Sequence, residues 1–78
     1  DEDLAKEALV YVQDDRLVID LQALTATYQG QVYDADGHQI TFAELTGGQV
    51  TTVRLPKRGV YVVTLRNTQS KAHFKVVY

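Results

Sequence analysis

The sequence contains no cysteine, no methionine and no tryptophan, and Pro56 is its single proline. Without cysteine the chain can form neither a disulfide nor a thiolate zinc site, and its two histidines are too few for a common structural metal centre. A chain of 78 residues is long enough for one domain only. Hydrophobic packing must therefore hold a single small core together, and we expect neither a metal nor a cofactor.

A strong net charge and long apolar runs are also absent. Ten acidic and eight basic residues give a net charge of −2, which provides no basic surface for nucleic acid. No apolar run approaches the roughly 20 residues of a membrane-spanning helix. The acidic start of the chain is unlike the positively charged beginning of a signal peptide. We therefore expect no nucleic-acid partner and no membrane-spanning segment, and a signal peptide, if one exists, lies elsewhere.

From Ala8 onwards the sequence has the two-residue period of β-strands, with frequent valine, threonine and tyrosine between regularly spaced turn signals. This pattern predicts an all-β fold, an Ig-like antiparallel β-sandwich of about seven strands. Residues 1–7 are expected to be a linker from a preceding domain, and residues 8–78 an Ig-like C-terminal domain. The expected strands are Ala8–Gln13, Arg16–Leu21, Ala26–Asp34, His38–Glu44, Gln49–Leu55, Gly59–Arg66 and Lys71–Tyr78.

Alternation along each expected strand assigns its side chains to the two faces of a sheet. The run from Leu55 to Tyr61 resembles the tyrosine corner of Ig-like sandwiches, so we expect the Tyr61 hydroxyl to bond backbone within residues 56–58. The residues expected to point outward are Gln29, Gln31, Thr41, Thr52, Arg54, Thr64, Lys71, His73 and Lys75. Those expected in the core are Leu17, Ile19, Leu21, Tyr28, Val32, Ile40, Phe42, Val53, Leu55, Tyr61, Val63, Leu65, Phe74 and Val76.

The segment Asp34-Ala35-Asp36-Gly37 is the part of the sequence most similar to a metal-binding motif. Aligning its glycine with the invariant glycine of an EF-hand loop places Val32 at the first ligand position and Ala43 at the position of the bidentate glutamate. Neither side chain can bind calcium. A β-turn in which an aspartate bonds its own backbone accounts for the segment, and we predict no metal site there.

The sequence contains no recognisable pattern of catalytic residues. His38 and His73 have no neighbouring ligand or general-base pattern, so we expect both to be solvated. Ser70 is the single serine, and neither a nucleophile elbow nor a glycine-rich phosphate loop is present. We expect no catalytic residue and no enzyme. Tyr11 and Tyr33 are the tyrosines that could be exposed, and a sugar-binding platform would need such rings in the solvent.

Three segments together resemble a known family: Gln31–Ile40 (QVYDADGHQI), Leu55–Leu65 (LPKRGVYVVTL) and Lys71–Tyr78 (KAHFKVVY). They are similar to the C-terminal domain of proteins exported by the bacterial type IX (Por) secretion system. That family has a VYDxxGxxV hairpin, an LPxGVYVVxV strand and a final KxxKVVV strand in this order. The resemblance covers about residues 16 to 78. It departs from the family at Glu7–Gln13, where many members have a PNP turn, and at His38, where an arginine is usual.

The resemblance implies a secretion signal that the outer-membrane translocon, its shuttle and a sortase recognise on an exported protein. It also implies a route through the periplasm to the outer membrane, the cell surface or the medium, and in many members transfer to anionic lipopolysaccharide. The turn motif consists of Asp34, Asp36 and Gly37. The candidate recognition residues are Gly59, Tyr61, Lys71, His73, Lys75, Val76 and Val77.

Two other functions fit the same sequence. One is a retained lipopolysaccharide- or carbohydrate-binding Ig-like module, and the other is a structural Ig-like spacer between domains. The edges of the first and last strands also allow a dimer or a strand swap in the isolated domain. The identity of the upstream protein, and whether the domain is cleaved or retained, are open at this point.

Overall fold

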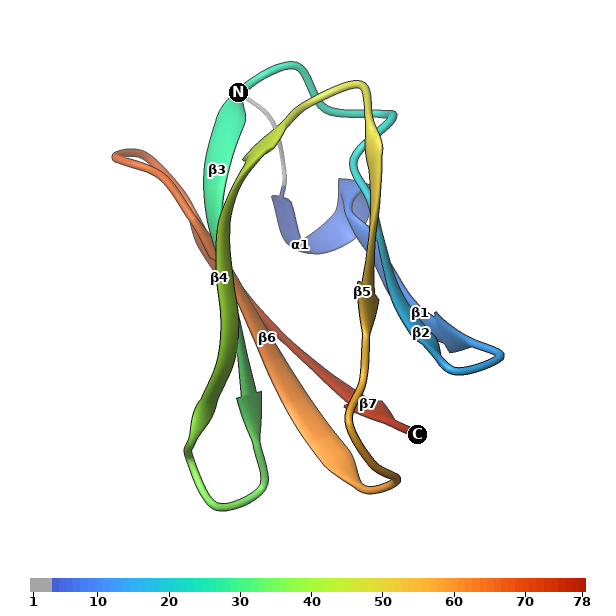
Figure 1. Ribbon diagram of the computed structural model, residues 1–78. Helices are drawn as coiled ribbons and strands as arrows, with labels where there is room; N and C mark the ends of the chain where they lie inside the picture. Colours follow the sequence, from blue (N-terminus) through green and yellow to red (C-terminus); the bar gives the residue numbers. More distant parts are fainter. Residues whose placement is uncertain (1–3) are drawn as a thin grey trace.

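The computed structural model describes residues 4–78, which form seven antiparallel strands in two facing sheets (Figure 1). The predicted all-β, Ig-like sandwich is confirmed, and each strand begins and ends within two residues of its predicted boundary. The strands are β1 (Leu9–Gln13), β2 (Arg16–Asp20), β3 (Thr27–Asp34), β4 (Gln39–Thr46), β5 (Val50–Arg54), β6 (Val60–Arg66) and β7 (Lys71–Val77).

One sheet has the strand order β1-β2-β5, and the other has the order β4-β3-β6-β7. The chain changes sheet three times, between β2 and β3, between β4 and β5, and between β5 and β6. These crossings bring segments that are distant in sequence into one four-stranded sheet, with β6 between β3 and β7. Within the described residues 4–78, the last strand is therefore an edge strand, and β6 is the strand that joins it to the sheet.

The core lies between the two sheets and is built from the inward side chains of both. Leu17, Val63 and Leu65 have no measurable exposure, and Tyr28 and Tyr61 are 2% and 1% exposed. The tyrosine corner is confirmed, because the buried Tyr61 side chain donates its hydroxyl hydrogen to the backbone carbonyl of Lys57. Burial of the ring and satisfaction of its hydroxyl at the same place fix how the chain enters β6.

The prediction that Phe42 lies in the core is wrong, because this side chain on β4 is 50% exposed. Val32 pairs with Thr41 whereas Tyr33 pairs with Gln39, so Ile40 is an extra residue in a β-bulge. One inserted residue reverses the alternation that follows it. Consequently Phe42 points to solvent, Thr41 takes a position on the inner side, and Leu45 is buried in the core at 4% exposure.

Part of the segment expected to be a linker packs onto the domain. Its residues 1–3 lie outside the described part of the chain, but Leu4–Glu7 form a single helical turn, α1. Leu4 is 3% exposed and belongs to the core, and the N–H of Ala8 donates to the Leu4 carbonyl at 3.1 Å. An apolar residue within an acidic segment therefore packs beside β7. Within residues 4–78, no helix is long and apolar enough to cross a membrane.

Candidate recognition surface on the last two strands

The three segments that carry the family resemblance meet in the four-stranded sheet. The β3–β4 turn, the β5–β6 turn and the end of β7 lie at the same end of this sheet, and Asp34 pairs with Tyr61, which pairs with Val76. The two turns line one shallow hollow, with Asp34 and Asp36 on one side and Lys57 and Arg58 on the other. Residues far apart in the sequence thus form a continuous surface whose parts are held in register by β6.

The predicted β3–β4 turn is organised by one carboxylate. Asp34 Oδ1 accepts hydrogen bonds from the backbone N–H groups of Asp36 and His38, both at 2.9 Å. Its Oδ2 lies 3.3 Å from His38 Nδ1, and the Gly37 N–H donates to the Asp34 carbonyl at 3.1 Å. Gly37 has a φ of 86°, which glycine adopts without strain. The exposed His38 is therefore a hydrogen-bonded part of the turn.

These contacts explain the acidity of Asp34. The hydrogen bond from the His38 N–H is the largest cause that holds the pKa of Asp34 below its ordinary value of 3.8. Asp34, Asp36 and His38 bring three potential metal-ligand atoms within 4.8 Å of one another. However, Asp34 Oδ1 already accepts two backbone N–H groups and Oδ2 lies against His38 Nδ1, which is the arrangement of an aspartate that closes a turn.

The depressed pKa makes a prediction about acid stability. The folded protein binds the Asp34 proton less tightly than the unfolded chain does, so the carboxylate stabilises the fold above about pH 4 and this stabilisation is lost below it. We expect urea unfolding to show a steeper fall in stability between pH 5 and about pH 3 for the wild type than for Asp34→Asn. Parallel stability curves for the two proteins would contradict this role of the carboxylate.

The β5–β6 turn holds the end of the last strand. Gly59 and Tyr78 exchange two backbone hydrogen bonds, at 2.9 and 3.2 Å, and the guanidinium of Arg58 lies 5.2 Å from the centre of the Tyr78 ring. Gly59 has a φ of 153°, a conformation that favours glycine over other residues. A cation over an aromatic face is attractive, so the turn fixes the end of the chain through both backbone and side chains.

The seven candidate recognition residues divide into two groups. Gly59, Tyr61 and Val76 are structural, because Gly59 shapes the turn while Tyr61 and Val76 pack opposite each other with exposures of 1% and 8%. The other four alternate along β7 and form an exposed row, with Val77 at 69% exposure. Among the seven candidates, the side chains of Lys71, His73, Lys75 and Val77 are the ones exposed to solvent on β7.

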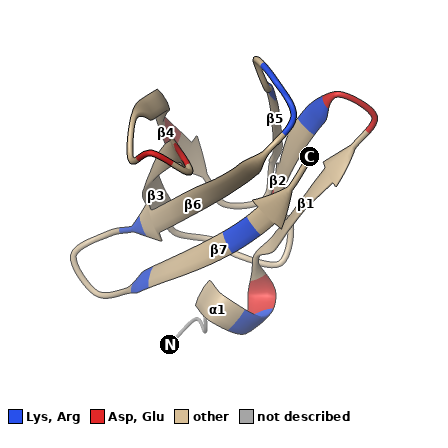
Figure 2. Ribbon diagram, turned by 90° about the horizontal axis from the view of Figure 1, so that it is seen from below, with Lys and Arg blue, Asp and Glu red and all other residues tan. Residues whose placement is uncertain are grey.

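Positive charge continues from this row onto β6. Arg66 pairs with Lys71 across the last hairpin, and neither strand contains an acidic residue. Figure 2 shows basic bands and no acidic band on β7. Thr64, predicted to be solvent-facing, is only 6% exposed on this face, and its hydroxyl lies 3.0 Å from His73 Nδ1. The hairpin signal at Asn67–Ser70 could have revealed the Arg66–Lys71 pair, because residues flanking a hairpin turn face one another.

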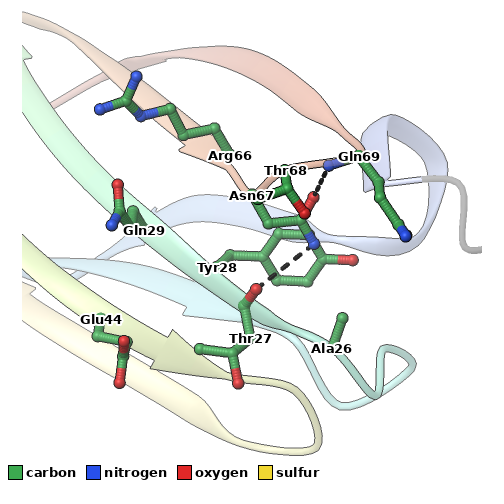
Figure 3. A pocket seen from close by; sticks show the side chains of 9 residues that line it. All are labelled: Ala26, Thr27, Tyr28, Gln29, Glu44, Arg66, Asn67, Thr68 and Gln69. Atoms are coloured by element: carbon green, nitrogen blue, oxygen red, sulfur yellow. Dashed lines mark hydrogen bonds between the residues drawn. The ribbon is translucent and has the colours of Figure 1, made fainter.

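A larger hollow of about 580 Å³ lies at the opposite end of the same sheet (Figure 3). Gln29 lies between Glu44 and Arg66 in the sheet, and the Asn67 side chain donates to the Thr27 carbonyl at 3.4 Å. The aromatic residue that lines this hollow, Tyr28, is 2% exposed. The hollow therefore offers polar groups but no exposed ring on which a sugar could stack.

No protein-family model matches the chain, and no curated protein matches it significantly. The family resemblance therefore depends on the three quoted segments and on their order.

Proposed function

We propose that this chain is a C-terminal signal domain that directs an exported protein through the type IX secretion system to the cell surface. The observation that carries the proposal is the resemblance of three segments, in order, to the family pattern. It is supported by their placement, because all three lie on neighbouring strands and turns of one sheet. A recognition signal whose parts are distributed over the sequence can form a single binding surface only if folding brings these parts together.

The residues of this surface fall into two groups, those that hold the strands in place and those that are exposed for binding. The Asp34 turn, Gly59 and Tyr61 hold the ends of β3, β6 and β7 in a fixed arrangement. Lys71, His73, Lys75 and Val77 present charge and apolar surface on the outer face of the edge strand. A rigid scaffold with an exposed edge strand suits recognition, and the proposed role is that of a binding module rather than an enzyme.

The partners in this proposal are the outer-membrane translocon, its shuttle and the sortase and attachment components. The domain passes through the periplasm and then remains at the cell surface or is released with the exported protein. Anionic lipopolysaccharide is a further candidate partner, because the exposed cations of β6 and β7 match its phosphate groups.

Fusion of residues 1–78 to an inert periplasmic reporter tests this proposal in a cell with a working type IX system. We expect the reporter to reach the cell surface, as it does when the same reporter carries an established signal domain of the family. If the established domain delivers the reporter while this chain leaves it in the periplasm, the proposal is wrong. A retained lipopolysaccharide- or carbohydrate-binding module would then become the better explanation.

A further inference from the structure

The hydrogen-bond pattern between β6 and β7 determines which backbone groups of the last strand are free. Gly59 and Tyr78 exchange both of their backbone hydrogen bonds, and the Asn67 N–H donates to the Ser70 carbonyl at 2.9 Å. In an antiparallel ladder, hydrogen-bonded pairs alternate with non-bonded pairs. The register therefore makes Ala72, Phe74 and Val76 the residues of β7 that bond to β6.

The remaining residues of β7 direct their N–H and C=O groups away from the sheet. These are Lys71, His73, Lys75 and Val77, the same residues whose side chains form the exposed row. Helix α1 and strand β1 lie near β7, but within residues 4–78 no backbone hydrogen bond joins either of them to it. Among residues 4–78, the edge of β7 thus has no partner strand, and its outward backbone groups and exposed side chains belong to the same residues.

The positive charge of the exposed residues on β7 determines which kind of strand can pair with its free edge. An added strand would place alternate side chains beside Lys71, His73 and Lys75 on the outer face, where Arg66 adds a further cation. If a second copy of β7 were added in antiparallel orientation about His73, each Lys71 would face a Lys75 of the other copy. Like charges opposite one another destabilise a strand pair in this register, whereas an acidic strand would place opposite charges beside the lysines, so the charge of this edge favours an acidic strand.

We propose that β7 binds an extended, acidic segment of a partner protein as an additional strand of the four-stranded sheet. Backbone hydrogen bonds to Lys71, His73, Lys75 and Val77 provide affinity, and acidic side chains at alternate positions of the segment pair with the lysines. This binding mode rests on the proposed function for the identity of the partner. The binding itself can be measured without any secretion machinery.

The test uses the isolated 78-residue chain and two short synthetic peptides. In one peptide glutamate alternates with valine and threonine, and in the other lysine replaces every glutamate. At low salt and about 1 mM, the range of weak peptide binding, we expect the acidic peptide to shift the amide NMR signals of the four free-edge residues. It should also slow the hydrogen exchange of these amides at least about threefold, whereas the basic peptide should change neither.

A pair of variants separates the backbone contribution from the charge. Lys75→Gln removes the charge but keeps the outward N–H, and we expect it to weaken binding of the acidic peptide about threefold. Lys75→Pro also removes the N–H, which is not bonded to β6, and we expect at least about tenfold weaker binding without loss of the fold. If Lys75→Pro unfolds, the NMR shifts that the acidic peptide causes in the wild type and in Lys75→Gln are sufficient to test the proposal.

The proposal is overturned if the acidic peptide produces no shifts at β7, if both peptides act equally, or if the shifts lie on β1, β4 or β5. Self-association of the chain through β7 would overturn it as well. None of these results would affect the reporter fusion. Conversely, failure of the reporter fusion would leave binding of the acidic peptide to be judged on its own result.

Discussion

Replacing Tyr61 by alanine is expected to lower the free energy of unfolding by about 3–5 kcal/mol, the usual cost of deleting a buried aromatic ring. The ring is 1% exposed, faces Val76 across the sheet and carries the hydroxyl that bonds Lys57. A domain of 78 residues has a total stability of about 4–12 kcal/mol. This single change therefore removes much of the stability, and thermal or urea unfolding measures the loss directly.

Tyr61→Phe is the matched control, because it keeps the ring and removes only the hydroxyl. We expect it to cost about 0.5–1.5 kcal/mol, the typical contribution of one hydrogen bond. Equal losses for the two variants would mean that the hydroxyl, rather than ring packing, dominates at this corner. A loss below about 1 kcal/mol for Tyr61→Ala would contradict the buried position of the ring and the tyrosine corner.

Most of the fold follows from period-two alternation combined with turn residues. The Asp36-Gly37 and Pro56–Gly59 signals divide the chain at real turns, and Tyr61 can be placed in the core because it follows such a turn at the spacing of a tyrosine corner. These features are local. For that reason they can be identified before the pairing of the strands is known.

Features that depend on tertiary context could not be predicted in the same way. The bulge at Ile40 reverses the side-chain alternation in β4, and no turn residue marks it in the sequence. Leu4 is an apolar residue in an acidic stretch, and its burial depends on the position of β7, about 70 residues later. Local sequence propensity predicts neither the bulge at Ile40 nor the burial of Leu4.

The candidate surface was predictable in part. Alternation along β7 identifies Lys71, His73 and Lys75 as an outward row, the family resemblance adds Val77, and the structure adds the neighbouring Arg66. The stacking of Arg58 on Tyr78 could not be inferred, because it requires the β5–β6 turn to lie beside the end of β7. Sequence alternation can therefore give the composition of a strand face, whereas the neighbours of that face come from the sheet topology.

Charge reversal on the exposed row of β7 tests most directly whether a partner recognises this row as the secretion signal. In the reporter fusion, the double variant Lys71→Glu and Lys75→Glu should reduce the amount of reporter at the cell surface at least about tenfold, because it places two acidic side chains against the partner's binding site. Both lysines are exposed, so the melting temperature should change little, as expected for surface substitutions of about 0.5 kcal/mol or less.

The matched control carries the same change of charge on the other sheet, as Arg16→Glu and Arg54→Glu. These arginines are exposed, and Arg54 makes only a long contact of 3.8 Å with Asp15. The measurement is the surface fraction of the reporter for the wild type and the two double variants, together with a melting curve for each. We expect loss of surface reporter for the β7 variant alone. Surface delivery of the β7 variant at the level of the wild type and the control would contradict it.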